Sequence, residues 1–215
     1  LYTLMGDFET AQQLEPEPGV GLLFLMRRYE ELIDQAEFMV IERPQDVELH
    51  YVLAFAYNAT GQFESAVHIL SRTGQPDTFL EHRVRSAADI EGYFALVNAL
   101  AGAGQINLAK ELAGYFEAEL WDAIPDWWNK AYGACGLAVM EQDDKALEIL
   151  QRIEDSPRLP LVSVIMDSFC FQRYEENPDY QALIHLVEER QAAKRKQLPS
   201  TLAKFDVALD QSPLK

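Results

Sequence analysis

The chain has 215 residues, of which 35 are acidic and 18 are Lys or Arg, so its formal net charge is −17 at pH 7. Hydrophobic residues make up 48% of it, which excludes disorder for most of its length and suits one domain or one array of small units. No apolar run approaches the roughly 18 residues that span a bilayer. The acidic balance argues against nucleic acid and anionic membranes as partners, because attraction to phosphate requires clustered positive charge.

The first residues indicate that the chain opens inside a structural unit. Leu1 to Met5 run at once into Gly6-Asp7-Phe8, a pattern typical of a helix end, a tight turn and the start of another helix. We expect a longer natural protein, so the lack of an export signal in this stretch carries no information about location.

The two cysteines, Cys135 and Cys170, both lie in apolar stretches with helical spacing. Two cysteines in a chain of this length are not a disulfide framework, and free cysteine is among the most buried residue types. We therefore expect two free buried thiols, with a disulfide or a reactive pair as the alternative. Free thiols in turn favour a cytoplasmic location.

Pairs of helices follow from the spacing of apolar residues. From Val47 to Tyr57 these residues recur at i, i+3 and i+4; Gly61 then interrupts the pattern, which resumes over residues 63–70. The same pattern predicts helices over 90–103 and 106–120 with a turn at Gly104, and over 127–140 and 143–153 with a turn at Glu141 and Gln142. Alternating runs that would indicate hairpin strands are nearly absent. The predicted fold class is all-α.

The helix pairs recur along the chain, because Leu32, Ala66, Ala109 and Ala146 take the same place in successive second helices. The clearest pair reads His50-x2-Leu53-Ala54-x2-Tyr57 on its first helix and Ala66-x3-Leu70 on its second. A large residue, Leu, a small residue and Tyr, followed by Ala-x3-Phe, form the signature of the tetratricopeptide (TPR) repeat. Over residues 1–155 the chain resembles a bacterial TPR protein with divergent repeats.

The resemblance implies a right-handed α–α superhelix, a solenoid in which antiparallel helix pairs stack because one pair cannot bury its apolar face alone. Lengthened helices or an inserted turn around residues 78–86 would make the superhelix irregular at that point. The segment Asn177-Pro178-Asp179-Tyr180 is similar to the motif that leads the last helix of many bacterial TPR proteins. The predicted array covers residues 1–198, as a half unit at 1–15, units at about 16–44, 45–78, 88–120 and 126–156, and a closing helix pair at 160–197; residues 199–215 form a C-terminal tail.

In TPR superhelices the first helix of each pair lines a concave groove that binds the ligand. Carried onto this chain, the resemblance assigns nine residues to the groove: Tyr51, Phe55, Asn58, Phe94, Asn98, Ala101, Trp128, Ala131 and Cys135. We expect Tyr51, Phe94 and Trp128 to form an aromatic ladder, and Asn58 and Asn98 to hydrogen-bond an extended peptide. The alternative is that the ladder packs against a chain terminus or a partner domain of the same protein. For Trp128 a joint between helices, together with Trp121 and Trp127, is the other interpretation.

Sequence motifs for catalysis and metal binding are absent: the chain contains no Gly-x-Ser-x-Gly, His-Glu-x-x-His, Cys-x-x-Cys or P-loop. Its four histidines are scattered without the spacing of metal ligands. We therefore predict that the chain is not an enzyme and has no cofactor and no bound metal. A basic cluster at Arg190 and residues 194–196 is best explained by the dipole of the last helix.

The predicted function is a non-catalytic scaffold that binds a protein or peptide in the groove. Chaperone-binding TPR modules hold the terminal carboxylate of a peptide with residues such as lysine, and Tyr51 and Phe94 stand where lysine would be expected. This difference and the net charge of −17 disfavour an acidic tail as the ligand and favour a neutral to basic partner. One alternative is a sensory or regulatory TPR region of a larger bacterial signalling or transcription-regulating protein. Another is an enzyme on an α-solenoid, such as a glycosidase, which requires convergent carboxylates. A homodimer through an exposed end pair is a further possibility, because solenoid ends need caps.

Overall fold

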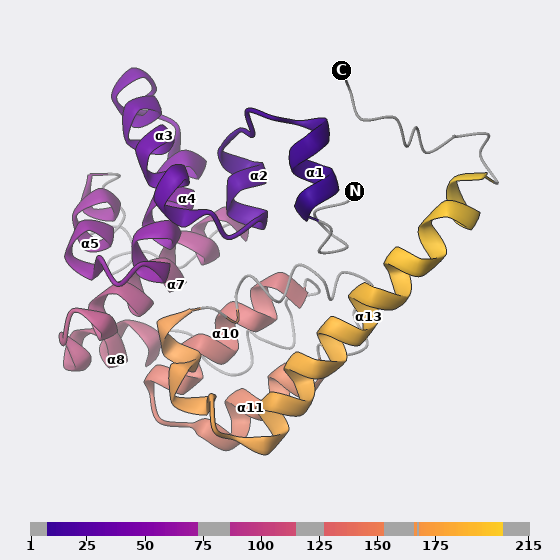
Figure 1. Ribbon diagram of the computed structural model, residues 1–215. Helices are drawn as coiled ribbons and strands as arrows, with labels where there is room; N and C mark the ends of the chain where they lie inside the picture. The colour runs from indigo at the N-terminus through magenta and orange to yellow at the C-terminus, as the bar shows by residue number, and fades with distance from the viewer. Residues whose placement is uncertain (1–7, 73–86, 115–126, 153–165, 167, 204–215) are drawn as a thin grey trace.

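The computed structural model describes residues 8–72, 87–114, 127–152, 166 and 168–203 (Figure 1). These residues form helices and contain no strand, which confirms the all-α class for the described part of the chain. The elements are α1 (Phe8–Leu14), α2 (Val20–Leu25), α3 (Tyr29–Glu42), α4 (Val47–Ala59), α5 (Phe63–Ser71), α7 (Ala87–Gly102), α8 (Ile106–Gly114), α10 (Trp127–Val139), α11 (Asp143–Arg152), the 3-10 helix η3 (Phe169–Tyr174) and α13 (Pro178–Ala203).

Four helix pairs share one kind of turn. The pairs are α2 with α3, α4 with α5, α7 with α8, and α10 with α11. The second residue after each first helix has a positive φ: 58° at Arg27, 73° at Gly61, 78° at Gly104 and 62° at Glu141. In each turn the next backbone N–H donates to the carbonyl oxygen five residues earlier, as Gln62 does to Tyr57 at 2.7 Å. This arrangement satisfies carbonyl groups at the helix end. The turns expected at Gly61, Gly104 and Glu141 are therefore confirmed.

The same positions of each second helix lie in the core. Leu32, Ala66, Ala109 and Ala146, each five residues after a positive-φ turn residue, have no exposed surface. Three of the four are alanine, and the small alanine side chain lets neighbouring helix backbones approach closely. Each second helix contacts its own first helix. The second helices α3, α5 and α8 also contact the first helix of the next pair, which is α4, α7 and α10 respectively. First helices also contact one another in chain order, from α2 to α4, α7 and α10, so one continuous core runs through the pairs.

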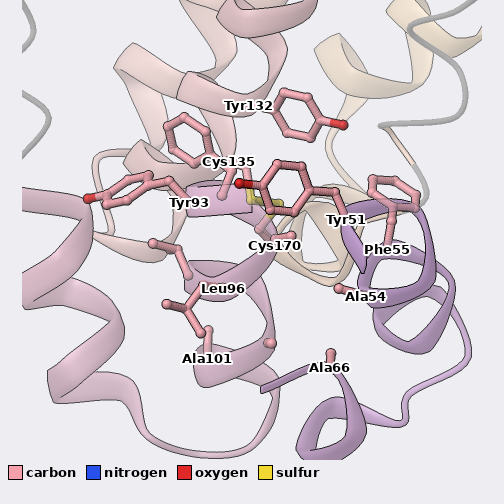
Figure 2. Packing of buried hydrophobic residues seen from close by; sticks show 14 of the residues in the cluster. Tyr51, Ala54, Phe55, Ala66, Tyr93, Leu96, Ala101, Tyr132, Cys135 and Cys170 are labelled. Carbon is pink, nitrogen blue, oxygen red and sulfur yellow. A yellow bond between two sulfur atoms is a disulfide. The ribbon is translucent and has the colours of Figure 1, made fainter. Parts of the chain in front are cut away.

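The cysteines are not free. Cys135 in α10 and Cys170 in η3 form a disulfide, with their Cα atoms 5.4 Å apart (Figure 2). The expectation of two free thiols was wrong, because the chain folds back after α11 and places η3 against α7 and α10. Spacing along the sequence carries no information about that return. The cytoplasmic location inferred from free thiols loses its premise and stays a prediction.

The last helix begins as expected and ends later. Asn177 Oδ1 accepts hydrogen bonds from the backbone N–H groups of Asp179 and Tyr180, at 2.9 and 3.1 Å, and Pro178 opens the helix. This is an N-terminal cap with proline in the first turn, where its missing N–H costs nothing. The helix then continues through Pro199 to Ala203, into the segment expected to be a tail. The insertion expected near residues 78–86 lies outside the described residues.

Two buried tyrosine hydroxyls tie neighbouring elements together. Tyr57 in α4 donates a hydrogen bond to Glu37 in α3, and Tyr174 in η3 donates to Asp143 in α11 at 2.7 Å. Burial, followed by the hydrogen bond to a carboxylate, raises the pKa of both tyrosines well above the ordinary value of 10. Both side chains therefore stay protonated in the folded state at a pH where they ionise in the unfolded chain.

These pKa shifts predict a specific loss of stability in alkali. Because folding raises both pKa values, the stabilisation is complete below about pH 10 and declines as the pH rises above it. Urea unfolding between pH 8 and 12 should show a steeper alkaline decline for the wild type than for the Tyr57→Phe/Tyr174→Phe variant. Parallel declines would show that the two hydroxyls do not have shifted pKa values.

Candidate functional site

The first helices of the four pairs meet around a pocket of about 130 Å³. Side chains from α2, α4, α7 and α10 all reach it, so it lies on the face where the sequence places the groove. Figure 2 shows three of its aromatic residues, Tyr51 and Phe55 from α4 and Tyr132 from α10, in the part of the core that also holds the disulfide. The residues that line the pocket are Phe24, Tyr51, Val52, Phe55, Glu91, Ala95 and Tyr132.

Contacts behind the pocket hold its walls in place. The Phe24 ring meets Phe55 edge to face, with ring centroids 5.0 Å apart. Tyr132 stacks in parallel on Phe94, with centroids 6.0 Å apart and planes 5° apart. Tyr51 lies directly over Gly92, where a Cβ atom would come within 2.2 Å of its ring. Because the rings are fixed from behind, the pocket is formed before any ligand arrives.

The described pocket walls are mainly apolar and carry a few polar groups, the hydroxyls of Tyr51 and Tyr132 and the side chain of Glu91. Glu91, near the start of α7, is the only carboxylate among the described lining residues and is half-buried. Phe24 and Val52 are also half-buried and form part of the rim, while Tyr51 and Phe55 are buried deeper. An apolar concave surface with a few polar groups is the usual composition of a site that anchors one side chain of a partner.

Two of the predicted groove residues, Tyr51 and Phe55, line the pocket. Phe94 does not: only 1% of it is exposed, and it lies behind Tyr132 and against Gly136. Tyr51 and Phe94 each stand ten residues before a positive-φ turn residue, and each packs on a glycine of the next first helix. Of the two ladder residues whose side chains the structure describes, both join successive helices, and Tyr51 reaches the pocket while Phe94 does not.

The two predicted asparagines bind backbone groups of this chain. Asn58 Nδ2 donates to the carbonyl oxygen of Ala95 at 2.9 Å and so joins α4 to α7. Asn98 Oδ1 accepts the backbone N–H of Cys170 at 2.9 Å. Asn98 and Cys135 both stand six residues before a turn residue, and both hold Cys170. On α7 and α10 this face therefore carries the chain's own η3.

The remaining predicted residues contribute nothing to the pocket that the structure describes. Ala101 and Ala131 are buried in helix contacts. Trp128 lies in α10, but its side chain is outside the described part of the molecule, as is the cluster expected around Pro125. The helix joint and the ligand contact proposed for Trp128 both stay predictions.

Sequence reasoning missed the pocket residues Phe24, Val52, Glu91, Ala95 and Tyr132. A usable signal lay in Gly92 and Gly136, which stand inside helices although glycine costs a helix about 1 kcal/mol relative to alanine. Glycine there indicates that another group approaches the backbone closely. In this fold that group is an aromatic ring, and Gly92 supports the ring of Tyr51 at the pocket wall.

Other chemistry is sparse in the described part of the chain. Within it, no three or more His, Cys, Asp or Glu side chains gather as a metal site would require. None of the helices described is long and apolar enough to cross a membrane. His50, which is buried, has its Nδ1 2.7 Å from the carbonyl oxygen of Asp46 and thus serves the start of α4.

Comparisons with known proteins identify no family for this chain. No family model, curated protein or solved structure matches this chain. The resemblance to TPR repeats accordingly stays a prediction from the sequence.

Proposed function

We propose that this chain is a non-catalytic scaffold that binds a segment of another protein on the face formed by α2, α4, α7 and α10. The observation that carries this proposal is a pocket to which all four first helices contribute side chains. A site assembled from successive repeats suits an elongated ligand, because the ligand can run from one helix to the next along the face.

The proposed architecture is a TPR-like right-handed superhelix. Its support is the positive-φ turn in each of the four pairs, the buried residue five positions later, and the stacking of the pairs in chain order. In such an array the first helices form the inner face, and this is the face that carries the pocket.

A polypeptide ligand suits this face better than a substrate. On this face Asn98 already accepts a hydrogen bond from a backbone N–H group, that of Cys170. Cys170 lies two residues after Ser168, whose backbone is extended. Hydrolysis of a glycoside ordinarily needs two carboxylates, and among the described residues Glu91 is the only one that lines the pocket. The net charge of −17 favours a neutral to basic partner, because charge complementarity speeds association and disfavours acidic chains.

Filling the pocket tests the proposal. In Val52→Trp an indole grows from a half-buried rim position toward the pocket, whereas Ile41→Trp places the same group at a position of α3 that is 74% exposed. Peptides selected from a random phage-displayed library on the wild type should bind Val52→Trp at least about tenfold more weakly, a loss of about 1.4 kcal/mol.

The control decides how the result is interpreted. Ile41→Trp should bind the selected peptides as the wild type does, and both variants should melt within a few degrees of it. Equal binding of the peptides to Val52→Trp, or selection of no peptide at all, would remove the proposed function.

A further inference from the structure

We infer that the exposed face of α3 is a second docking surface, and that it fits an amphipathic helix of a partner with lysine or arginine on both sides of its apolar stripe. This inference goes beyond the proposed function, since none of the described pocket residues comes from α3. Phe38 and Ile41, one turn apart on this helix, are 63% and 74% exposed. The helix lies at the edge of the molecule, and its buried side packs on α2 and α4 (Figure 1).

Phe38 stands where other second helices have an exposed arginine. Eleven residues after the positive-φ turn residue, the chain has Arg72 directly after α5 and Arg152 at the end of α11. In α3 that place is taken by Phe38, and the helix continues through Ile41 to Glu42. It has 14 residues, whereas α5 and α8 have 9 and α11 has 10, so a helix pair is complete without its last turn. An exposed apolar extension that the fold does not need is typical of an interaction surface.

The charges around this apolar pair have one sign. Asp34 lies four residues before Phe38 and seven before Ile41, so the three side chains share one face of the helix. No lysine or arginine occurs within α3, and its acidic residues, all exposed, are Glu30, Glu31, Asp34, Glu37 and Glu42.

Basic residues at the ends of α3 do not neutralise this face. Arg28 pairs with Glu31, and Arg43 pairs with Asp46 at 3.2 Å. Glu42 lies in the last turn, at the negative end of the helix dipole, where a basic side chain is normally the favourable one. Lysine or arginine from a partner would therefore complement both the carboxylates and the dipole.

A helix suits this face better than an extended segment. The backbone groups within α3 are bonded inside the helix, so a strand cannot add main-chain hydrogen bonds to them. On a partner helix, residues at i, i+3, i+4 and i+7 share one face, so its apolar residues can pack around Phe38 and Ile41 while flanking basic residues reach the carboxylates. A second copy of this chain fits less well, because α3 against α3 would bring two sets of five carboxylates together.

Two designed peptides test the inference. Both are alanine-rich and about 20 residues long, which is enough for an isolated helix to form in water. One carries a leucine stripe flanked by lysines, and in the other glutamine replaces every lysine. At an ionic strength of about 0.15 M, the lysine peptide should bind the protein at least about tenfold more tightly than the glutamine peptide does.

Matched variants locate the contact. Phe38→Ser/Ile41→Ser should bind the lysine peptide at least about tenfold more weakly than the wild type. Ile106→Ser/Leu108→Ser removes two apolar side chains of α8 that are 42% and 37% exposed, and it should bind the peptide as the wild type does.

A second pair of variants tests the charges at constant net charge. Asp34→Asn/Glu42→Gln should bind the lysine peptide at least about threefold more weakly than Glu64→Gln/Glu111→Gln, which removes two exposed carboxylates from α5 and α8 instead.

The outcomes separate this inference from the proposed function. If Phe38→Ser/Ile41→Ser binds the lysine peptide as tightly as the wild type, net charge alone holds the peptide and the inference fails. Equal binding of the two peptides overturns it as well, as does self-association of the wild type that the same variant abolishes, since a second copy would then be the occupant. Val52→Trp should bind the lysine peptide normally, so the loss of library peptides on that variant tests the pocket alone.

Discussion

Reduction of the disulfide between Cys135 and Cys170 should lower the free energy of unfolding by about 3–4 kcal/mol. The bond joins residues 35 positions apart, and closing a loop of that length removes conformational entropy from the unfolded chain. Both cysteines are buried, and the backbone N–H of Cys170 is also held by Asn98, so the native geometry around the bond is already fixed. A typical domain has a total stability of only about 5–15 kcal/mol, so the expected loss is large.

Urea unfolding with and without a reductant measures this effect, and Cys135→Ala/Cys170→Ala provides the same comparison without a reductant. A thiol reagent applied to the unfolded, unreduced protein should find no free thiol, and after reduction it should find both cysteines. Two free thiols in protein purified in air, together with equal urea midpoints, would show that the cysteines are unpaired as the sequence suggested. That result would also restore the premise for a cytoplasmic location.

Gly92→Ala should lower stability by about 1–3 kcal/mol, the usual cost of overpacking a core. Helix propensity alone predicts the opposite sign, because alanine stabilises a helix interior by about 1 kcal/mol relative to glycine. The added Cβ atom would lie 2.2 Å from the ring of Tyr51, which is only 4% exposed and has little freedom to move. The sign of the measured change therefore reports whether Tyr51 packs on α7 as described.

Gly21→Ala is the matched control, because nothing lies within 4 Å of a Cβ atom at that position of α2. It should be neutral or slightly stabilising in urea or thermal unfolding. Gly92→Ala should in addition weaken binding of the selected peptides, since displacement of Tyr51 changes the pocket wall. A Gly92→Ala variant more stable than the wild type would contradict the contact between α4 and α7.

Local features of the fold could be predicted from the sequence. The turns at Gly61, Gly104 and Glu141 were expected because helical periodicity stops and resumes around them, and that signal lies within a few residues. The start of α13 at Asn177 and Pro178 is equally local. The resemblance to TPR repeats also led to Tyr51 and Phe55, two residues that line the pocket.

Long-range features could not be predicted in the same way. The hydrogen bond from Cys170 to Asn98 joins residues 72 positions apart, and no pattern in the sequence indicates that the chain returns to this face. The pocket depends on the register in which one helix pair stacks on the next, which places Tyr132 of α10 beside Tyr51 of α4. The same register decides whether Phe94 faces the pocket or packs on a glycine. In this fold it packs on Gly136 and does not line the pocket.

Partner binding at the face of the first helices is tested most directly by locating a selected peptide on the protein through intermolecular NMR contacts. We expect contacts from one peptide side chain to the methyl groups of Val52 and Ala95 and to the Tyr132 ring. The opposite surface provides a competing site, since Phe38 and Ile41 of α3 are 63% and 74% exposed. Contacts confined to Phe38 and Ile41, with unchanged signals at Val52 and Ala95, would contradict the assignment of partner binding to the face of the first helices.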